Sequence, residues 1–282
     1  MKIIGTGLSG LVGSRIVELL SDRYTFEDMS FDTGVDIRDK EVVAKKVRAS
    51  DADILLHMAA KSDVDGCEKD KPLGEEGDAW NINVLGTKNI VNAAKNAEKK
   101  LIYISTDFVF NGTKTVYSEE DVPHPTNWYA KTKYEGERVV KESGLPYIIM
   151  RIAYPYRAQF AKKKDFVKAV ASRLAKGESV AAVTDHVMTP TFIDDIASAF
   201  DALVRADATG TYHVVGSQFV SPYEACLRIG RAFGYNESLI TKTTRAEYFE
   251  GRAKRPNNLA LSNAKIRKLG IRMRGFEEGL EE

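Results

Sequence analysis

Residues 5–13, Gly5-Thr6-Gly7-Leu8-Ser9-Gly10-Leu11-Val12-Gly13, decide the fold, because they follow a short apolar run and open an amphipathic stretch. Gly7 permits a tight turn, Gly10 lets backbone N–H groups approach a pyrophosphate, and Gly13 allows close helix packing. A glycine-rich turn without a ligand is the alternative. A strand, a glycine loop and a helix in this order nevertheless favour dinucleotide binding. The loop residues predicted to hold it are Gly7, Ser9, Gly10, Leu11, Val12 and Gly13.

Short apolar strands alternate with longer amphipathic helices through the first half of the chain. This alternation predicts an α/β fold with a Rossmann-like, doubly wound parallel sheet. The expected strands are Lys2 to Gly5, Tyr24 to Asp28, Asp53 to Met58, Leu101 to Ser105 and Tyr147 to Arg151. The expected helices are Leu11 to Leu20, Asp39 to Arg48, Ala79 to Asn96 and Trp128 to Lys141.

After about Arg151 the pattern loosens, which predicts a smaller C-terminal α/β substrate lobe. We expect a solvated loop at Lys162 to Lys164, a strand at Thr211 to Val215, and helices at Asp165 to Lys176, Ile193 to Ala206 and Pro222 to Phe233. The predicted dinucleotide-binding domain is residues 1–155, to which 190–216 return. The predicted substrate-binding lobe is residues 156–189 and 217–282.

The composition excludes several classes of protein. Forty-one basic and forty acidic residues leave a net charge of +1, so no overall field draws the chain to nucleic acid or membrane. No apolar run approaches about 18 residues. Cys67 and Cys226 lie far apart without metal-ligand spacing, which is typical of reduced thiols. The expectation is a cytoplasmic protein with a small-molecule substrate; whether it forms a homodimer is left open.

Tyr129 and Lys133 have Tyr-x-x-x-Lys spacing, which stacks a phenol and an ammonium on one face of a helix. A nearby positive charge lowers the pKa of a tyrosine from its usual value near 10. The pair is therefore a candidate acid/base device. Alone the spacing is common on exposed helices. Ser105-Thr106 and the glycine loop upstream favour the catalytic interpretation.

In NAD-binding proteins, an acidic residue at the end of the second strand accepts a hydrogen bond from a hydroxyl of the adenine ribose. Asp28 is the candidate for that acid, and a solvated turn residue is nearly as good an interpretation. Arg15 could instead meet the 2′-phosphate of NADP, although an arginine there is more often on the surface. We expect NAD or NADP, with NAD slightly preferred.

Several motifs in order carry a family resemblance. The most specific is Ser105-Thr106-Asp107-Phe108-Val109-Phe110-Asn111-Gly112, which resembles the reductase signature S-T-D-Y-V-F-D-G. The chain is similar to the extended short-chain dehydrogenases/reductases, and most of all to the dTDP-4-dehydrorhamnose reductase family. The other matching segments are Asp36-Ile37-Arg38-Asp39, His57-Met58-Ala59-Ala60, residues 81–87 (NINVLGT), residues 125–137 (PTNWYAKTKYEGE) and residues 255–261 (RPNNLAL).

The resemblance implies an NAD(P)-dependent reductase of a keto group on a nucleotide-linked sugar. By this resemblance Tyr129 donates a proton to the carbonyl oxygen, Lys133 lowers the pKa of Tyr129 and holds the nicotinamide ribose, and Thr106 hydrogen-bonds the same carbonyl oxygen. Further residues assigned to the cofactor are Asp28, Asp36, Ile37, Ala59, Ala60, Asn83 and Ser105. Those assigned to the substrate are Asp107, Phe108, Tyr154 and Arg255, the arginine as a partner for a diphosphate.

One departure limits this reading. Phe108 replaces the tyrosine of the signature, and because it cannot perform acid chemistry, a 4,6-dehydratase is disfavoured. Two alternatives remain open. A sugar-nucleotide epimerase would use the same Tyr129. A non-catalytic NAD(P)-binding protein would resemble the regulatory subunit of methionine adenosyltransferase.

Other polar residues receive structural interpretations. His57 ends an apolar strand and is expected to be a packed, hydrogen-bonded core residue. Asp194-Asp195 is expected to cap a helix start. Tyr154 and Tyr156 are equally suited to lining a cleft and to packing. The histidines are scattered, so we expect no metal site.

Overall fold

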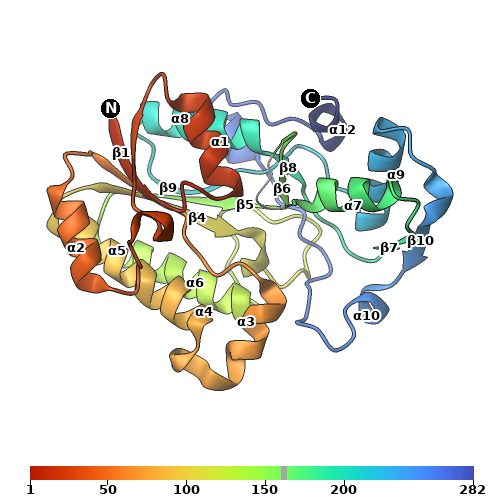
Figure 1. Ribbon diagram of the computed structural model, residues 1–282, viewed down its shortest axis with the longest axis horizontal. Coiled ribbons are helices and arrows are strands. Elements are labelled where there is room, and N and C mark those ends of the chain that lie inside the picture. The colour runs from red at the N-terminus through yellow and green to blue at the C-terminus, as the bar shows by residue number, and fades with distance from the viewer. Residues whose placement is uncertain (160–163) are drawn as a thin grey trace.

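A six-stranded parallel sheet forms the centre of the protein, seen in a computed structural model that describes residues 1–159 and 164–282 (Figure 1). The strand order is β2-β1-β3-β4-β5-β9. This order confirms the predicted doubly wound sheet, because the chain moves outward from β1 in both directions. The strands are β1 (Lys2–Thr6), β2 (Thr25–Asp28), β3 (Ile54–His57), β4 (Lys100–Thr106), β5 (Tyr147–Ile152) and β9 (Gly210–His213).

Helices cover both faces of the sheet. One face is covered by α1 (Leu11–Leu20) and α8 (Ile193–Arg205), which pack on residues such as Ile3 and Leu56. On the other face lie α2 (Lys40–Ala49), α5 (Thr87–Asn96) and α6 (Trp128–Lys141), packed on residues such as Ile4 and Leu55 (Figure 1). Neighbouring residues of each central strand thus face two separate cores, which explains why these strands are apolar without interruption.

The predicted bounds of α1 and α6 agree with the structure, since Gly10 and Asn127 mark where these helices begin. The segment expected as one helix over Ala79 to Asn96 is helical throughout, but part of it is wound as a π-helix. It comprises α4 (Asp78–Trp80), a π-helical segment at Asn81–Gly86, and α5. The helix α3 (Val64–Asp70) and the 3-10 helices Phe31–Thr33, Lys71–Glu76 and Asp107–Val109 were not predicted.

The later part of the chain builds a smaller lobe with its own core. Its elements are β6 (Pro155–Tyr156), α7 (Phe166–Leu174), β7 (Val180–Val183), β8 (Thr191–Phe192), α9 (Pro222–Ala232), the 3-10 helix Glu237–Leu239, β10 (Ile240–Thr243), α10 (Arg245–Tyr248) and α12 (Phe276–Leu280). In this lobe β10 pairs with β7 and β6 with β8, all parallel. The loop predicted at Lys162 to Lys164 lies outside the described residues except for Lys164.

The last segment of the chain returns to the sheet. The helix α11 (Ala264–Arg267) contributes Ile266 to the core under α1 and α8, and Ile271 and Met273 join the same core. Cys67 and Cys226 are both buried free thiols, as expected. Among the described residues, no helix has the length and apolar character needed to cross a membrane.

Candidate active site

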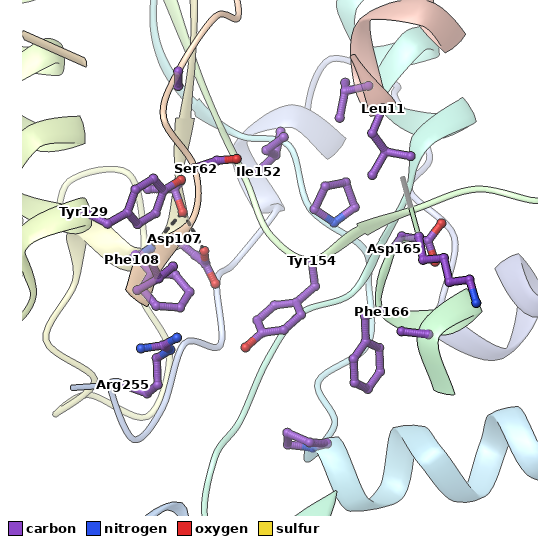
Figure 2. A pocket seen from close by; sticks show the side chains of 18 of the residues that line it. Leu11, Ser62, Asp107, Phe108, Tyr129, Ile152, Tyr154, Asp165, Phe166 and Arg255 are labelled. Carbon is purple, nitrogen blue, oxygen red and sulfur yellow. Dashed lines mark hydrogen bonds between the residues drawn. The ribbon is translucent and has the colours of Figure 1, made fainter. Parts of the chain in front are cut away.

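A cleft of about 820 Å³ opens where the sheet meets the smaller lobe (Figure 2). It lies at the carboxyl ends of β1, β3, β4 and β5, where ligands bind in open α/β sheets. Figure 2 shows Tyr129, Asp107 and Phe108 on one side, Asp165 and Phe166 across the cleft, and Tyr154 between them. The predicted site residues that line it are Gly7, Gly10, Leu11, Val12, Gly13, Ala59, Ala60, Ser105, Thr106, Asp107, Phe108, Tyr129, Lys133, Tyr154 and Arg255.

The glycine loop forms a cradle of backbone groups. Gly7 has φ of +68°, and a Cβ there would approach within 2.9 Å of the Ala59 nitrogen. A Cβ at Gly13 would lie 2.8 Å from Leu8 Cα, so only glycine lets α1 pack this closely against the loop. A Cβ at Gly10 would meet one atom, the Gly7 carbonyl oxygen at 3.2 Å. Because α1 has no side-chain cap and no acid in its first turn, its N-terminus is suited to an anion.

Five predicted cofactor residues do not line this cleft: Ser9, Asp28, Asp36, Ile37 and Asn83. Asp36 forms an ion pair with Arg38, and Ile37 packs against Gly86. Asn83 is buried and uses its amide to hold Lys61 N and O and the Thr132 hydroxyl, so the Asn83 side chain fastens a loop to α6. The Asp36 carboxylate is thus engaged by a neighbour in sequence, and Ile37 and Asn83 are engaged by contacts with distant segments.

Asp28 keeps a free acceptor at the end of β2. One carboxylate oxygen accepts from Ser30 Oγ at 2.8 Å. The other, Oδ1, is buried and has no hydrogen-bond partner. An unpaired buried oxygen costs free energy, which a hydroxyl donor from a ligand would relieve. The alternative candidate Arg15 is already bound to Asp194 at 2.6 and 2.7 Å and to Glu18.

Tyr129 and Lys133 lie one helical turn apart on α6, which begins at the cap residue Asn127, whose side chain accepts from Ala130 N at 2.8 Å. Burial raises the pKa of Tyr129 above its usual value, and hydrogen bonding with Thr106 opposes that rise only in part. The expected lowering of this pKa by Lys133 is therefore corrected. The Lys133 ammonium instead donates to the Ile104 carbonyl at 2.9 Å and lies 4.1 Å from the centre of the Tyr103 ring.

The charge of Lys133 depends on a buried carboxylate. Burial lowers the pKa of Lys133 to about 7, and the Glu137 carboxylate acts against this shift. Burial alone would raise the pKa of Glu137, but the hydrogen bonds and charge of Arg151 hold it below its usual value. The two Arg151–Glu137 bonds measure 2.8 and 2.7 Å. A fixed negative charge thus faces the lysine from the next helical turn.

Thr106 and Asp107 sit at the end of β4, facing Tyr129. The Thr106 hydroxyl donates to Asp107 Oδ1 at 3.0 Å and accepts from the Phe108 N–H at 3.3 Å. Asp107 Oδ2 is buried without a partner, and burial raises the pKa of this carboxyl to about 7. Phe108 lines the cleft and packs edge-on against Tyr129 at 6.0 Å between ring centres. Phe108 therefore supplies an apolar wall where the signature tyrosine would supply a hydroxyl.

Arg255 enters the cleft from the smaller lobe beside a second arginine. Arg255 pairs with Asp65 of α3 at 2.9 Å, and Arg252 pairs with the same carboxylate at 2.6 Å. Both guanidiniums lie over Phe249, at 4.8 and 5.1 Å from the ring centre. Two positive charges share one carboxylate here, which leaves a positive excess at the cleft wall.

Tyr154 and Tyr156, which follow β5, lie in different environments. Tyr154 lines the cleft with φ of +41°, and its hydroxyl lies 3.1 Å from His186 Nε2. Tyr156 is buried in the smaller lobe, where its hydroxyl donates to the Phe276 carbonyl at 3.2 Å. The sequence had left both roles open for each residue.

The structural interpretation of His57 is confirmed, and that of Asp194-Asp195 is corrected. His57 is fully buried between the Thr6 and Thr87 hydroxyls, and burial lowers its pKa to about 3. Asp194 and Asp195 do lie in the first turn of α8, but neither caps it. Asp194 binds Arg15, and Asp195 binds Arg274. Within the described residues, no three histidine, cysteine or acidic side chains are grouped to hold a metal ion.

Three residues of this region were missed: Asp65, Arg252 and His186. The Arg252–Asp65 contact spans 187 positions in sequence, so no local periodicity could reveal it. The one usable signal for Arg252 was its position three residues before the predicted Arg255.

The comparisons agree with this geometry. The family described as RmlD substrate binding domain matches residues 1–282. The chain belongs to this family. The crystal structure of dTDP-4-dehydrorhamnose reductase from Bacillus anthracis in complex with NADP superposes with a TM-score of 0.90 at 30% identity, covering 99% of this chain and 97% of that one. This protein therefore has the RmlD-type fold of the extended short-chain dehydrogenases/reductases.

Two relatives by sequence differ in what they are named for. A probable low-salt glycan biosynthesis reductase, Agl14, from Haloferax volcanii is 30% identical over 289 residues, which covers 98% of this chain and 94% of the relative. The methionine adenosyltransferase 2 subunit beta of Mus musculus is 28% identical over 296 residues, covering 100% and 86%. The relatives of this chain thus include a protein named as a probable reductase and a protein named as a subunit of another enzyme.

Proposed function

We propose that this protein is an NAD(P)-dependent reductase of a keto group on a nucleotide-linked sugar. The observation that carries the proposal is that the glycine cradle and the side chains of Thr106, Tyr129 and Lys133 line one continuous cleft. A carbonyl reductase needs a dinucleotide beside a proton donor, and the presence of these residues in one cleft supports such an arrangement.

The glycine cradle suits a dinucleotide. Gly10, which is exposed and lines the cleft, and the uncapped N-terminus of α1 fit a pyrophosphate, because backbone N–H groups and the helix dipole both favour anions. The backbone at Ala59 and Ala60 lines the same cleft. The nicotinamide supplies hydride when bound.

The Tyr129 phenol then donates the proton that the carbonyl oxygen requires. Its raised pKa keeps it protonated at neutral pH, which is the form a reductase needs before transfer. The Thr106 hydroxyl, which donates its hydrogen to Asp107 in this structure, turns to donate it to the same oxygen. The Lys133 ammonium stabilises the phenolate left after transfer. Arg255 and Arg252 supply the positive wall for a diphosphate.

Asp28 supports a preference for NAD over NADP. Its unpaired oxygen can accept from a ribose hydroxyl, whereas its negative charge opposes a 2′-phosphate. We expect Asp28→Asn to lower the KM for NADPH relative to the KM for NADH. Asp32→Asn, on the exposed turn nearby, is the matched control. An unchanged ratio in Asp28→Asn would remove Asp28 from cofactor selection.

The proposal also assigns cofactor binding and substrate binding to different lobes. Residues 1–155, with 190–216, hold the cofactor, and residues 156–189 with 217–282 hold the substrate. The pairing of β9 with β5 and the separate core of the smaller lobe support this division.

A second candidate is a non-catalytic partner of a methionine adenosyltransferase, favoured by the 28% identity to subunit beta over the whole chain. That function would leave Tyr129 unused. Co-purification with the synthetase and no turnover of any keto sugar would support it.

The deciding assay is oxidation of NADH and NADPH with dTDP-4-dehydrorhamnose. We expect one cofactor oxidised per sugar reduced, whereas an epimerase would show no net consumption. Tyr129→Phe should slow the reaction by about 10²- to 10⁴-fold. Tyr134→Phe, on the same helix but outside the cleft, should leave the rate unchanged. If neither dinucleotide raised the melting temperature, the proposal would be wrong.

A further inference from the structure

Tyr154 occupies the middle of the cleft in a backbone conformation that tyrosine rarely adopts. Its φ of +41° lies in the left-handed region, which is unfavourable for a side chain with a Cβ. The ring is held edge-on against Phe166 at 6.1 Å between centres (Figure 2). A strained residue in a binding cleft suggests that the position of its hydroxyl is used.

The partner of this hydroxyl is the buried His186. The imidazole Nδ1 lies 2.8 Å from the Pro256 carbonyl oxygen, and Nε2 lies 3.1 Å from the Tyr154 hydroxyl. A carbonyl oxygen can only accept, so Nδ1 must carry a hydrogen. Burial lowers the pKa of His186, the Arg245 charge acts in the same direction, and the Pro256 carbonyl and the Asp185 charge oppose it only in part. The ring is therefore neutral, and Nε2 has no hydrogen.

The direction of the second hydrogen bond follows from the first. Because Nε2 of the neutral ring can only accept, the Tyr154 hydroxyl must donate its single hydrogen to His186. The remaining lone pairs of the tyrosine oxygen can then only accept from a ligand. Besides His186, the charged or titratable groups that act on this hydroxyl within residues 1–159 and 164–282 are Asp107, Arg255 and Tyr248.

We infer that His186 is a positioning residue that makes the Tyr154 hydroxyl a hydrogen-bond acceptor, so that the cleft selects a substrate with a donor, such as a sugar hydroxyl, at this point. The inference deepens the proposed function and rests on it for the identity of the substrate. The same imidazole holds the carbonyl of Pro256, directly after Arg255. It therefore joins Tyr154, in the middle of the cleft, to the segment that carries Arg255.

The hydrogen-bond direction can be measured without any turnover. The chain has only four histidines, so the full-length protein labelled with ¹⁵N-histidine gives few signals, and His186→Gln identifies those of His186. We expect a protonated Nδ1 and an unprotonated Nε2 at pH 7. A ring protonated on Nε2, or on both nitrogens, would overturn the inference. Failure of the proposed function would leave this spectrum unchanged, so the two failures are distinguishable.

The consequence for selectivity is tested by binding of dTDP-glucose and its deoxyfluoro analogues, because fluorine in place of a hydroxyl cannot donate. At one ring position we expect fluorine to weaken binding about 3- to 10-fold in the wild type and not in Tyr154→Phe. Equal losses in both proteins at every position would refute the selection of a donor.

Variants of His186 separate positioning from a merely structural role. Glutamine has one acceptor and a donor amide, so His186→Gln can reproduce both bonds and should keep the fluorine effect. His186→Phe fills the space without making either hydrogen bond and should lose the fluorine effect on binding. Its KM should rise by a larger factor than its kcat falls. His124→Phe, at an exposed histidine, is the matched control. If Gln and Phe behaved alike, or if only the melting temperature changed, positioning would be refuted.

Discussion

The buried Glu137–Arg151 pair under the active site allows a quantitative test. Glu137 is fully buried, Arg151 is 1% exposed, and two hydrogen bonds of 2.8 and 2.7 Å join them. His213 lies beside Arg151, but burial lowers its pKa to about 3, so it is neutral. Glu137→Gln keeps the shape of the side chain and removes the carboxylate charge that is paired with Arg151.

Removing one partner of a buried ion pair costs about 3–5 kcal/mol, because the other charge remains desolvated without compensation. For a chain of this size, such a loss lowers the melting temperature by about 10 °C. Removing both charges is far less costly, since the desolvation penalty disappears together with the attraction. We therefore expect Glu137→Gln combined with Arg151→Met to recover most of the stability that Glu137→Gln loses.

Urea unfolding followed by circular dichroism measures these free energies. Glu142→Gln is the control, because Glu142 is an exposed member of an ion pair at the end of the same helix and should change stability by less than about 0.5 kcal/mol. The reasoning would be refuted if Glu137→Gln cost under about 1 kcal/mol, or if the double variant were less stable than the single one.

Three further predictions concern the cleft. Tyr129→Phe should lower kcat by about 10²- to 10⁴-fold with dinucleotide affinity nearly unchanged, as measured by steady-state kinetics and calorimetry; retained turnover would exclude it as the proton donor. Gly13→Ala should abolish thermal stabilisation by NAD(H), because its Cβ would lie 2.8 Å from Leu8 Cα; an undiminished shift would contradict the proposed cradle. Lys133→Met should stabilise the protein most below pH 7. Burial lowers the lysine pKa from 10.5 to about 7, so the cost of its buried charge is complete below pH 7 and falls as pH rises towards 10.5. A gain in stability that does not change with pH would show that the buried charge of Lys133 is not its cause.

The order of secondary structure could be predicted because its signals are local. The glycine loop, the apolar strands and the cap at Asn127 act over a few residues, and α1 and α6 have the predicted bounds. These local signals do not specify how tightly a helix is wound. The helix expected over Ala79 to Asn96 contains a π-helical segment at the point where Gly86 packs on Ile37.

The lining of the cleft was predicted where residues follow strand ends. Parallel strands bring their carboxyl ends to one edge, so Gly7, Ala59, Thr106 and Tyr154 had to converge. Asn83, which was predicted to contact the cofactor, does not line the cleft. Its position in a helix does not reveal that Lys61 and Thr132 occupy its amide.

The sequence by itself thus determined the sheet, the glycine cradle and the spacing of Tyr129 and Lys133, since backbone conformation and periodicity are encoded locally. Only the tertiary structure decided the protonation chemistry. Burial raises the pKa of Tyr129 and lowers that of Lys133, and the partners of His186 set the direction of a hydrogen bond. These properties depend on desolvation and on contacts between distant segments, which exist only once the chain has folded.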